Sequence, residues 1–196
     1  MATQIAPTEN PEASAMTDIL ARQRAAFMGE LPVGAAIRKD RLKRAIALLK
    51  DNSASLTAAL SEDFGHRSEM QSQFTDIAGS VGPLSHALKH VDDWMKPEKR
   101  SVDFPLNLMG AKARVAFQPK GVVGVISPWN FPVNLTFGPL AQIFAAGNRA
   151  MVKPSEFTPE TSGLMARLAA KYFDPTELSF VNGGPDVGKA FAALPF

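Results

Sequence analysis

Hydrophobic residues recur with a helical period through most of the first hundred positions. Met16, Leu20 and Phe27 fall on one face of the earliest run. We expect a disordered tail over 1–15, which has little to bury, and a helical segment over 16–100. Further amphipathic helices are expected to begin near Ile37, Ser53 and Ser68.

The last of these helices carries both a start signal and breakers. Ser68 and Gln71 have the spacing of a capping box, in which a hydroxyl satisfies a free amide of the first turn. Gly79, Gly82 and Pro83 follow within it, and proline removes a helical hydrogen bond. We therefore expect this helix to bend or break near these three residues.

The helix around Ile37–Leu49 is basic opposite its apolar stripe. Such a face is typical of a solvated helix surface, which we favour over an anion-binding patch. The basic residues are Arg38, Lys39, Arg41, Lys43 and Arg44.

After a charged linker at 96–100, the pattern turns from helical to extended. Ala113–Phe117 alternates apolar and polar residues and predicts a strand. Val102–Leu106 is its expected partner, although Pro105 confines that strand to an edge. We thus predict a β-hairpin over 101–118.

Short apolar strands alternate with amphipathic helices from Gly121 onward. Three strand–helix units at this spacing predict parallel strands joined by crossover helices, and hence an α/β fold. The expected strands are Val122–Ile126, Ala150–Val152 and Leu178–Val181, and the expected helices are Leu135–Ala146, Pro159–Tyr172 and Asp186–Ala193.

The sequence stops directly after the third of these helices. A sheet that ended there would leave its last strand as an unprotected edge, which proteins avoid. We therefore expect either a truncated protein or one that completes its sheet with another chain.

Composition narrows the possible functions. The 196 residues are 45% hydrophobic, which supports a folded core and excludes a disordered chain. A net charge of +2, with no basic block, does not suggest nucleic-acid binding. The chain has no cysteine, so it contains no disulfide, no thiolate metal site and no cysteine nucleophile.

Membrane and export signals are also lacking. The first residues have neither a basic nor an apolar region of a signal peptide. The longest mostly apolar stretch, Val133–Ala146, is too short to span a bilayer. We expect a cytoplasmic protein without membrane contact.

Candidate chemistry follows the ends of the predicted strands, where ligands gather in open α/β sheets. Asn130 stands between two aromatic residues in a proline-stiffened segment, 126–132. Its carboxamide suits hydrogen bonding to an oxygen that becomes negative, as in an oxyanion hole. The competing interpretation is that Asn130 closes the turn onto its own backbone.

Lys153 and Glu156 follow the second strand. An ammonium and a carboxylate at this spacing suit a nucleotide ribose, because the carboxylate accepts from both hydroxyls while the ammonium donates. A surface ion pair that caps the next helix is an equal alternative.

A glycine-rich segment follows the third strand. Gly183 to Lys189 nearly matches a phosphate-binding loop, but position 190 is Ala, which lacks the hydroxyl that holds magnesium. A turn that allows close backbone approach is the simpler interpretation. If the loop does bind phosphate, the chain is instead a nucleotide-binding or interaction module.

Other active-site patterns are weak. His86 and His90 are four residues apart, but they lack the intervening glutamate of a metalloprotease helix, and we predict no metal site. No serine lies in a G-x-S-x-G elbow, so a hydrolase triad has no support.

Taken together, the three segments identify a resemblance. PWNFP at 128–132, GNRAMVKPSE at 147–156 and FVNGGPDVG at 180–188 resemble, in order and spacing, motifs of the aldehyde dehydrogenase superfamily. DFGHRS at 63–68 and WMKPEKR at 94–100 are similar to its class-3-like branch, particularly to coniferyl aldehyde dehydrogenases. The similarity extends from about Met16 onward.

The resemblance implies an incomplete aldehyde dehydrogenase fold: a helical layer, a hairpin for oligomerisation, and over 119–196 the first half of a Rossmann-like NAD-binding domain. It implies Asn130 as the oxyanion-binding amide of the catalytic site, and NAD as cofactor, with NADP possible. The cofactor-binding positions it implies are Ile126, Ser127, Pro128, Trp129, Lys153, Ser155, Glu156 and Gly184.

One departure from the family pattern limits the activity expected of this chain. The family uses a cysteine nucleophile and a glutamate base from a C-terminal part that is absent here. The resemblance therefore implies an NAD(P)-dependent enzyme that oxidises an aldehyde, of the coniferyl type, to the acid, with this chain inactive in isolation. It also implies a homodimer formed through the hairpin.

Overall fold

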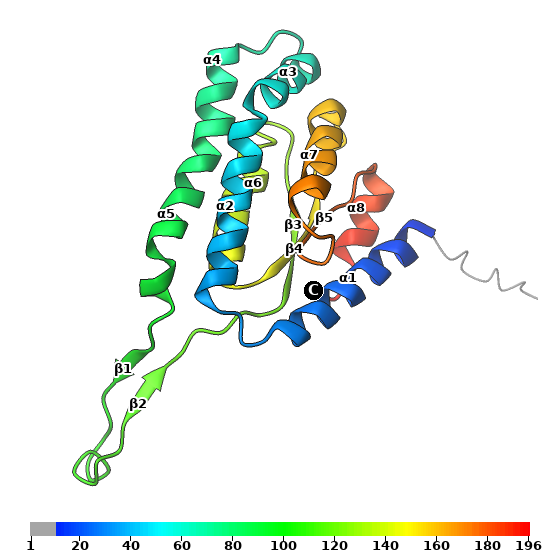
Figure 1. Cartoon of the computed structure of the whole chain (residues 1–196). Coiled ribbons are helices and arrows are strands. Elements are labelled where there is room, and N and C mark those ends of the chain that lie inside the picture. The colour runs from blue at the N-terminus through cyan, green and yellow to red at the C-terminus, as the bar shows by residue number, and fades with distance from the viewer. Residues whose placement is uncertain (1–10) are drawn as a thin grey trace, which may run out of the picture.

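A computed structural model describes residues 11–196, and it places a small parallel sheet between layers of helices (Figure 1). The first helix, α1, spans Pro11–Glu30. It therefore includes 11–15, which we expected in the tail, because proline is well suited to the first turn of a helix. The rest of the expected tail lies outside the described residues.

The helical segment that follows is longer and more continuous than expected. Ser68 caps its last long helix as predicted, since its Oγ accepts from Gln71 N at 3.5 Å. The expected break near Pro83 is wrong: a π-helical turn comes first, and the helix then continues through the proline. Pro83 lies near the start of α5, and it lacks one backbone N–H of the helix. The helix continues because Leu84, Ala87 and Val91, which follow it, are buried in the core. The elements are α2 (Ala35–Asp51), α3 (Ser53–Phe64), α4 (Glu69–Ser72), the π-helical turn η1 (Gln73–Ala78) and α5 (Gly79–Trp94).

The sheet has three parallel strands in the order β3-β4-β5, as the alternating pattern predicted. Gly147, at φ +84°, ends the first crossover helix in a left-handed conformation that glycine tolerates. The strands are β3 (Val122–Ile126), β4 (Arg149–Lys153) and β5 (Leu178–Phe180), and the helices are α6 (Asn134–Ala145), α7 (Pro159–Tyr172) and α8 (Pro185–Ala192).

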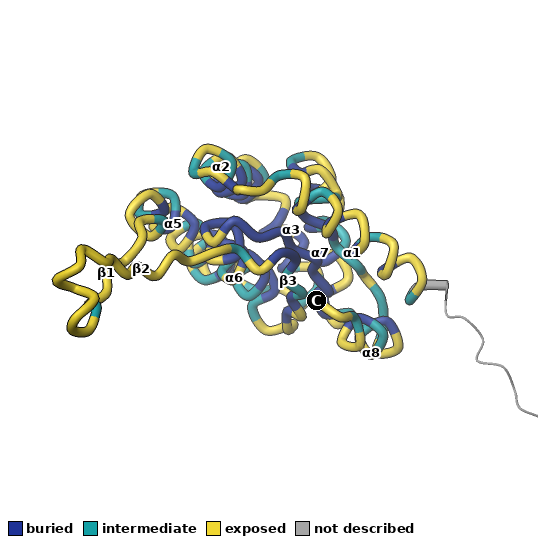
Figure 2. Tube along the Cα trace, turned by 90° about the horizontal axis from the view of Figure 1, so that it is seen from below, coloured by how far each residue is buried: buried dark blue, intermediate teal, exposed yellow. Residues whose placement is uncertain are grey.

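Alternate residues of each strand pack into two different cores. Ala150 and Val152 of β4 belong to the larger core, which includes side chains of α2, α3, α5, α6 and α7. Met151, between them, packs with Met16 of α1 and Phe191 of α8 in the smaller core. The sheet is therefore the middle of three layers, and its buried strands lie at the centre of the molecule (Figure 2).

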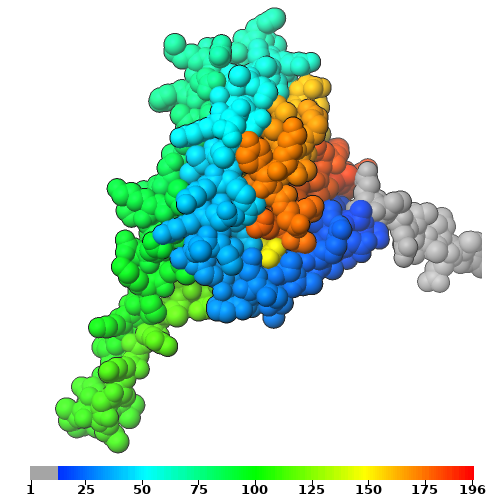
Figure 3. Space-filling view, in the orientation of Figure 1, coloured from blue at the N-terminus to red at the C-terminus, as the bar shows by residue number. Residues whose placement is uncertain are grey.

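The hairpin projects from this body as an exposed arm (Figures 2 and 3). β1 (Glu98–Arg100) pairs antiparallel with β2 (Ala113–Val115). The predicted partner strand, Val102–Leu106, is wrong. That stretch forms a turn in which the Asp103 carbonyl accepts a hydrogen bond from Asn107 N. Pro105 has no backbone N–H and so cannot donate a hydrogen bond to a neighbouring strand. The strand instead forms from the residues expected to be a linker.

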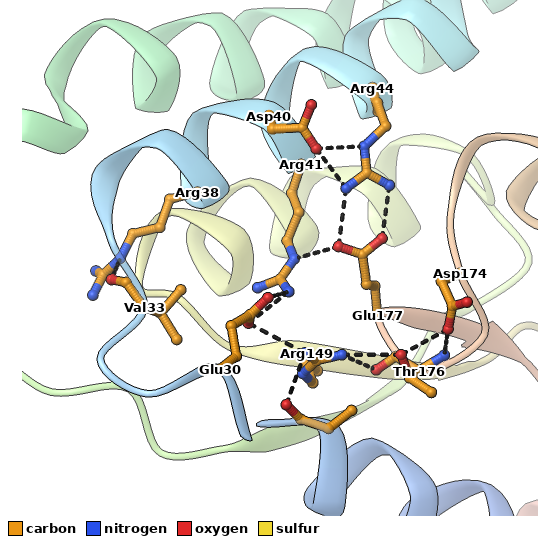
Figure 4. A network of polar contacts seen from close by, with 11 residues as sticks. Glu30, Val33, Arg38, Asp40, Arg41, Arg44, Arg149, Asp174, Thr176 and Glu177 are labelled. Carbon is orange, nitrogen blue, oxygen red and sulfur yellow. Dashed lines mark hydrogen bonds and ion pairs between the residues drawn. The ribbon is translucent and has the colours of Figure 1, made fainter. Parts of the chain in front are cut away.

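The basic face of α2 is not the solvated surface we expected. Arg41 is fully buried, and its guanidinium bonds Glu30 at 2.7 Å and Glu177 at 2.9 Å. Arg44 also bonds Glu177, at 2.7 Å, and Arg149 bonds Glu30 at 3.2 Å (Figure 4). These charges join α1, α2 and the amino ends of β4 and β5.

Glu177 is the acid shared by both arginines of α2. Burial alone would raise its pKa, but hydrogen bonds and charge from Arg44 and Arg41 lower the pKa of Glu177 to about 2. The carboxylate is therefore ionised throughout the neutral range. Because it precedes β5, this network lies at the sheet edge opposite the strand ends at which we expect ligands.

No helix within 11–196 combines the length and the hydropathy that crossing a bilayer requires.

Candidate functional site

The first two candidate segments meet at the carboxyl edge of the sheet. Ile126 lies opposite Lys153 in the parallel register of β3 and β4, and Ser127 N donates to the Lys153 carbonyl at 3.1 Å. Paired residues of neighbouring strands direct their side chains to the same face. Ile126 and Lys153 thus share the face of the sheet that α1 and α8 cover.

Lys153 and Glu156 form an ion pair at this edge, with Nζ and Oε2 separated by 2.6 Å. The Lys153 side chain is 5% exposed, whereas that of Glu156 is 31% exposed. The hydrogen bond from Lys153 lowers the pKa of Glu156. A buried ammonium therefore orients a carboxylate that remains open to solvent.

The third segment also reaches this pair. A side chain added at Gly188 of α8 would place its Cβ 3.8 Å from the Lys153 Cε. Gly184 is the residue that precedes α8, and no side chain within residues 11–196 caps the first backbone amides of that helix. The structure therefore brings parts of all three sequence segments to one edge, with Lys153 in the middle.

Asn130 lies on the exposed loop that leaves β3. Within residues 11–196 its carboxamide makes no hydrogen bond, so the closed turn that we considered as an alternative is not formed. Its backbone carbonyl accepts from Arg67 Nη1 at 3.2 Å. Trp129 and Ile126, on the same segment, are 53% and 58% exposed. This loop presents a free amide and apolar surface together.

The two candidate serines support the loops. Ser127 is 2% exposed, and its Oγ accepts from Thr136 Oγ1 of α6 at 2.8 Å. Ser155 is 9% exposed, and its Oγ accepts from the amide of Phe157 at 3.2 Å. Both hydroxyls already have partners within the chain, whereas Pro128 beside Ser127 is exposed.

Sequence reasoning missed two acids that hold helices at this edge. Asp63 of α3 accepts from the amides of Glu160 and Thr161, at 3.0 and 2.8 Å, and so caps α7. Asp76 of η1 accepts from the amides of Val133 and Asn134, at 3.1 and 3.2 Å, at the start of α6. Each cap comes from a segment far away in the chain, so local capping patterns gave no signal.

Asp76 is fully buried and pairs with Arg67, whose Nη2 lies 2.7 Å from Oδ2. Burial raises the pKa of Asp76, while the Asn134 amide and the Arg67 charge oppose that rise.

The glycine-rich turn does not present its lysine as a phosphate loop would. Lys189 Nζ is paired with Asp186 at 3.1 Å on the exposed surface of α8. At Gly183, an added Cβ would lie 2.4 Å from Val187 Cγ2. The absence of a side chain at Gly183 therefore serves the packing of α8.

The paired histidines contact each other along α5. The rings of His86 and His90 are 4.4 Å apart and tilted by 38°, and His90 stacks on Trp94. Among residues 11–196, no three histidine, cysteine or acidic side chains are arranged to hold a metal ion.

Comparison with known proteins identifies relatives of similar sequence and fold. The profile of the aldehyde dehydrogenase family matches residues 2–195. A "Probable coniferyl aldehyde dehydrogenase" of Caulobacter vibrioides is 55% identical over 92% of this chain and 38% of its own length. The "Coniferyl aldehyde dehydrogenase" of a Pseudomonas species is 55% identical over 90% of this chain and 36% of its own length. The chain thus spans little more than a third of either relative.

Two solved structures show the same fold. The substrate-bound Staphylococcus aureus AldH superposes with a TM-score of 0.85 at 29% identity, covering 92% of this chain and 39% of that one. An indole-3-acetaldehyde dehydrogenase in complex with NAD+ gives a TM-score of 0.77 at 28% identity, covering 92% and 36%. The partial coverage is the same as in the sequence comparison.

Proposed function

The chain belongs to the aldehyde dehydrogenase family, and from that premise we propose that it supplies the ribose-binding part of an NAD site and the amide of an oxyanion hole. The observation that carries this proposal is the Lys153–Glu156 pair at the carboxyl edge of the sheet, beside Ile126. A buried lysine that orients a half-exposed carboxylate matches the donors and acceptors of a ribose diol.

The donor set fits NAD in chemical detail. The Glu156 carboxylate accepts hydrogen bonds from ribose hydroxyls, and the Lys153 ammonium donates to their oxygens. Exposed Ile126 and Trp129 offer an apolar wall for the flat rings of the dinucleotide. The negative charge of Glu156 disfavours a 2′-phosphate, so we propose NAD before NADP. A relative solved with NAD+ supports this choice.

The role proposed for Asn130 concerns the aldehyde. In the proposed reaction an aldehyde is oxidised to a carboxylic acid, and NAD, when bound, accepts the hydride. The oxygen of the aldehyde becomes negative during nucleophilic attack, and an amide fixed nearby stabilises it. The free carboxamide of Asn130 suits this task. The names of the two 55% identical relatives support an aromatic substrate of the coniferyl type.

We also propose that the hairpin mediates a homodimer. Its apolar side chains are unusually exposed for a chain of this size, and burial between two copies would remove them from water. The residues are Phe104, Leu106, Leu108, Met109 and Phe117. A cytoplasmic location remains a prediction from the sequence.

Glu156→Gln should weaken NAD binding about tenfold while leaving NADP binding unchanged or improved. The amide accepts more weakly from the ribose hydroxyls, which corresponds to the loss of about one charge-assisted hydrogen bond. Removing the negative charge also relieves its repulsion of a 2′-phosphate. Isothermal titration of the purified chain with each dinucleotide measures both effects.

Asp186→Asn is the matched control, because it breaks another lysine–acid pair of the same spacing, at the glycine-rich turn. It should leave the NAD affinity unchanged. Equal weakening of NAD and NADP by Glu156→Gln would overturn the ribose role, and an ATP affinity that depends on Asp186 and Lys189 would favour the phosphate-loop alternative.

A further inference from the structure

We propose that Arg67, together with Asp76, is the positioning device that holds the Asn130 loop in place for its oxyanion role. This inference rests on the proposed function of Asn130, but the contacts that carry it are independent of any ligand. Arg67 follows α3, Asp76 lies nine residues later in η1, and Asn130 lies beyond β3, so two segments that are far apart in the sequence meet here.

Arg67 binds the loop from the inside. Its side chain is 6% exposed, and its guanidinium lies between two aromatic rings, 4.9 Å from the centre of Phe64 and 5.1 Å from that of Phe131. Nη1 donates to the carbonyl of Asn130 at 3.2 Å. The same planar group therefore contacts both the catalytic candidate's backbone and the residue that follows it.

Asp76 fixes Arg67 and the end of the loop together. Oδ2 pairs with Arg67 Nη2 at 2.7 Å, and Oδ1 accepts from the amides of Val133 and Asn134. Asn134 returns a contact, since its Nδ2 donates to the Thr75 carbonyl at 2.9 Å. One buried carboxylate thus joins the arginine to the first turn of α6.

A free carboxamide needs such support. Because no bond within 11–196 holds the Asn130 side chain, its direction depends on the backbone that carries it. Catalytic hydrogen bonds lose much of their effect when the donor moves by even 1 Å. Arg67 and Asp76 brace the backbone on both sides of the Phe131–Pro132 step. The only contact of Arg67 with Asn130 among residues 11–196 is to its backbone carbonyl, so Arg67 acts through the Asn130 backbone.

Amide exchange in the 196-residue chain tests the brace directly. In Arg67→Met, the amides of Val133 and Asn134 should exchange at least about tenfold faster relative to that of Ala150 in β4, because Asp76 loses its partner. Arg67→Lys keeps the charge opposite Asp76 but lacks the planar fork. It should give a smaller acceleration of the same two amides, and it serves as the test if Arg67→Met does not fold.

Arg38→Met is the matched control. Arg38 is 7% exposed and donates to the carbonyl of Ala145, at the other end of the same helix, α6. Its loss should lower stability without singling out Val133 and Asn134. The proposal is wrong if, in the Arg67 variants, the exchange rates of these two amides rise only as much as that of the Ala150 amide. Arg67 would then contribute to general stability alone, as Arg38 does.

Turnover separates this inference from the proposed function. In a chimeric enzyme with this chain in place of the matching residues of the Pseudomonas relative, Arg67→Lys should lower kcat about tenfold with the KM for NAD unchanged. Arg38→Met should leave kcat unchanged. If Asn130→Ala lowers kcat but Arg67→Lys does not, the positioning role fails. If Asn130→Ala has no effect, the oxyanion role fails instead.

Discussion

Replacing Asn130 with alanine should lower turnover by about 10²- to 10³-fold, the usual loss when one oxyanion donor is removed. The KM for NAD should change little, because Asn130 is proposed to act on the reacting oxygen and not on the ribose. The assay needs the thiol and the base that the family uses, so it is made in the chimera with the Pseudomonas relative, by following NADH formation at saturating NAD and coniferyl aldehyde.

Two controls define this result. The 196-residue chain alone should form no NADH, since it contains no cysteine. Asn52→Ala removes a different carboxamide, one that bonds the Leu48 carbonyl and the Tyr172 hydroxyl. It should cost stability and leave kcat intact. An unchanged kcat in Asn130→Ala would contradict the oxyanion role of Asn130.

Replacing Glu177 with alanine should lower the free energy of unfolding by about 3–5 kcal/mol, because it leaves the charges of Arg41 and Arg44 without their shared partner. Arg41 is fully buried, so water does not readily replace the lost carboxylate. Urea unfolding at pH 7 measures the change. Asp40→Ala removes only a 60% exposed partner of Arg44 and should cost less than about 1 kcal/mol. Similar losses in both variants would contradict the role assigned to Glu177.

The same carboxylate predicts an acid-dependent stability. Because the folded pKa of Glu177 is about 2, below its ordinary value of 4.5, its contribution to stability is present above the unfolded pKa and is lost as the pH falls from there toward 2. A depression of this size corresponds to about 3 kcal/mol. Between pH 6 and pH 2.5, Glu177→Ala should therefore lose less stability than the wild type does. If the free energy of unfolding falls by the same amount in the wild type and in Glu177→Ala, Glu177 is not the group responsible.

Local patterns predicted the α/β half of the chain well. β3 and α7 begin and end at the expected residues. In each element, apolar residues recur at regular spacing and glycine or proline stands near an end. The bounds of the element therefore depend on residues that are neighbours in the sequence. The π-helical turn before Gly79 was not predicted, because such turns are rare within α-helices.

Long-range pairing was beyond sequence reasoning. Arg41 is buried and Arg44 half-buried because their partners Glu30 and Glu177 come from the end of α1 and the residue before β5, whereas Lys43 is exposed. The predicted partner strand of the hairpin was wrong because charged and apolar exposed strands differ little in a two-stranded ribbon.

In the candidate site, too, contacts between neighbours in the sequence could be predicted and long-range contacts could not. Lys153 and Glu156 are three residues apart, and the ion pair that they form was one of the two interpretations of that spacing. Their position beside Ile126 followed from parallel strand order. Arg67 and Asp76 reach this edge from the helical segment, and nothing in their local sequence distinguishes them from surface charges.

The central claim is that the carboxyl edge of this sheet receives the adenosine half of NAD. The most direct test is an NMR titration of the ¹⁵N-labelled chain with NAD. The account predicts that the largest amide shifts fall at Ile126–Trp129, Lys153–Glu156 and Gly184, and that Glu156→Gln reduces them. No saturable shifts at millimolar NAD, or shifts confined to residues away from this edge, would contradict it.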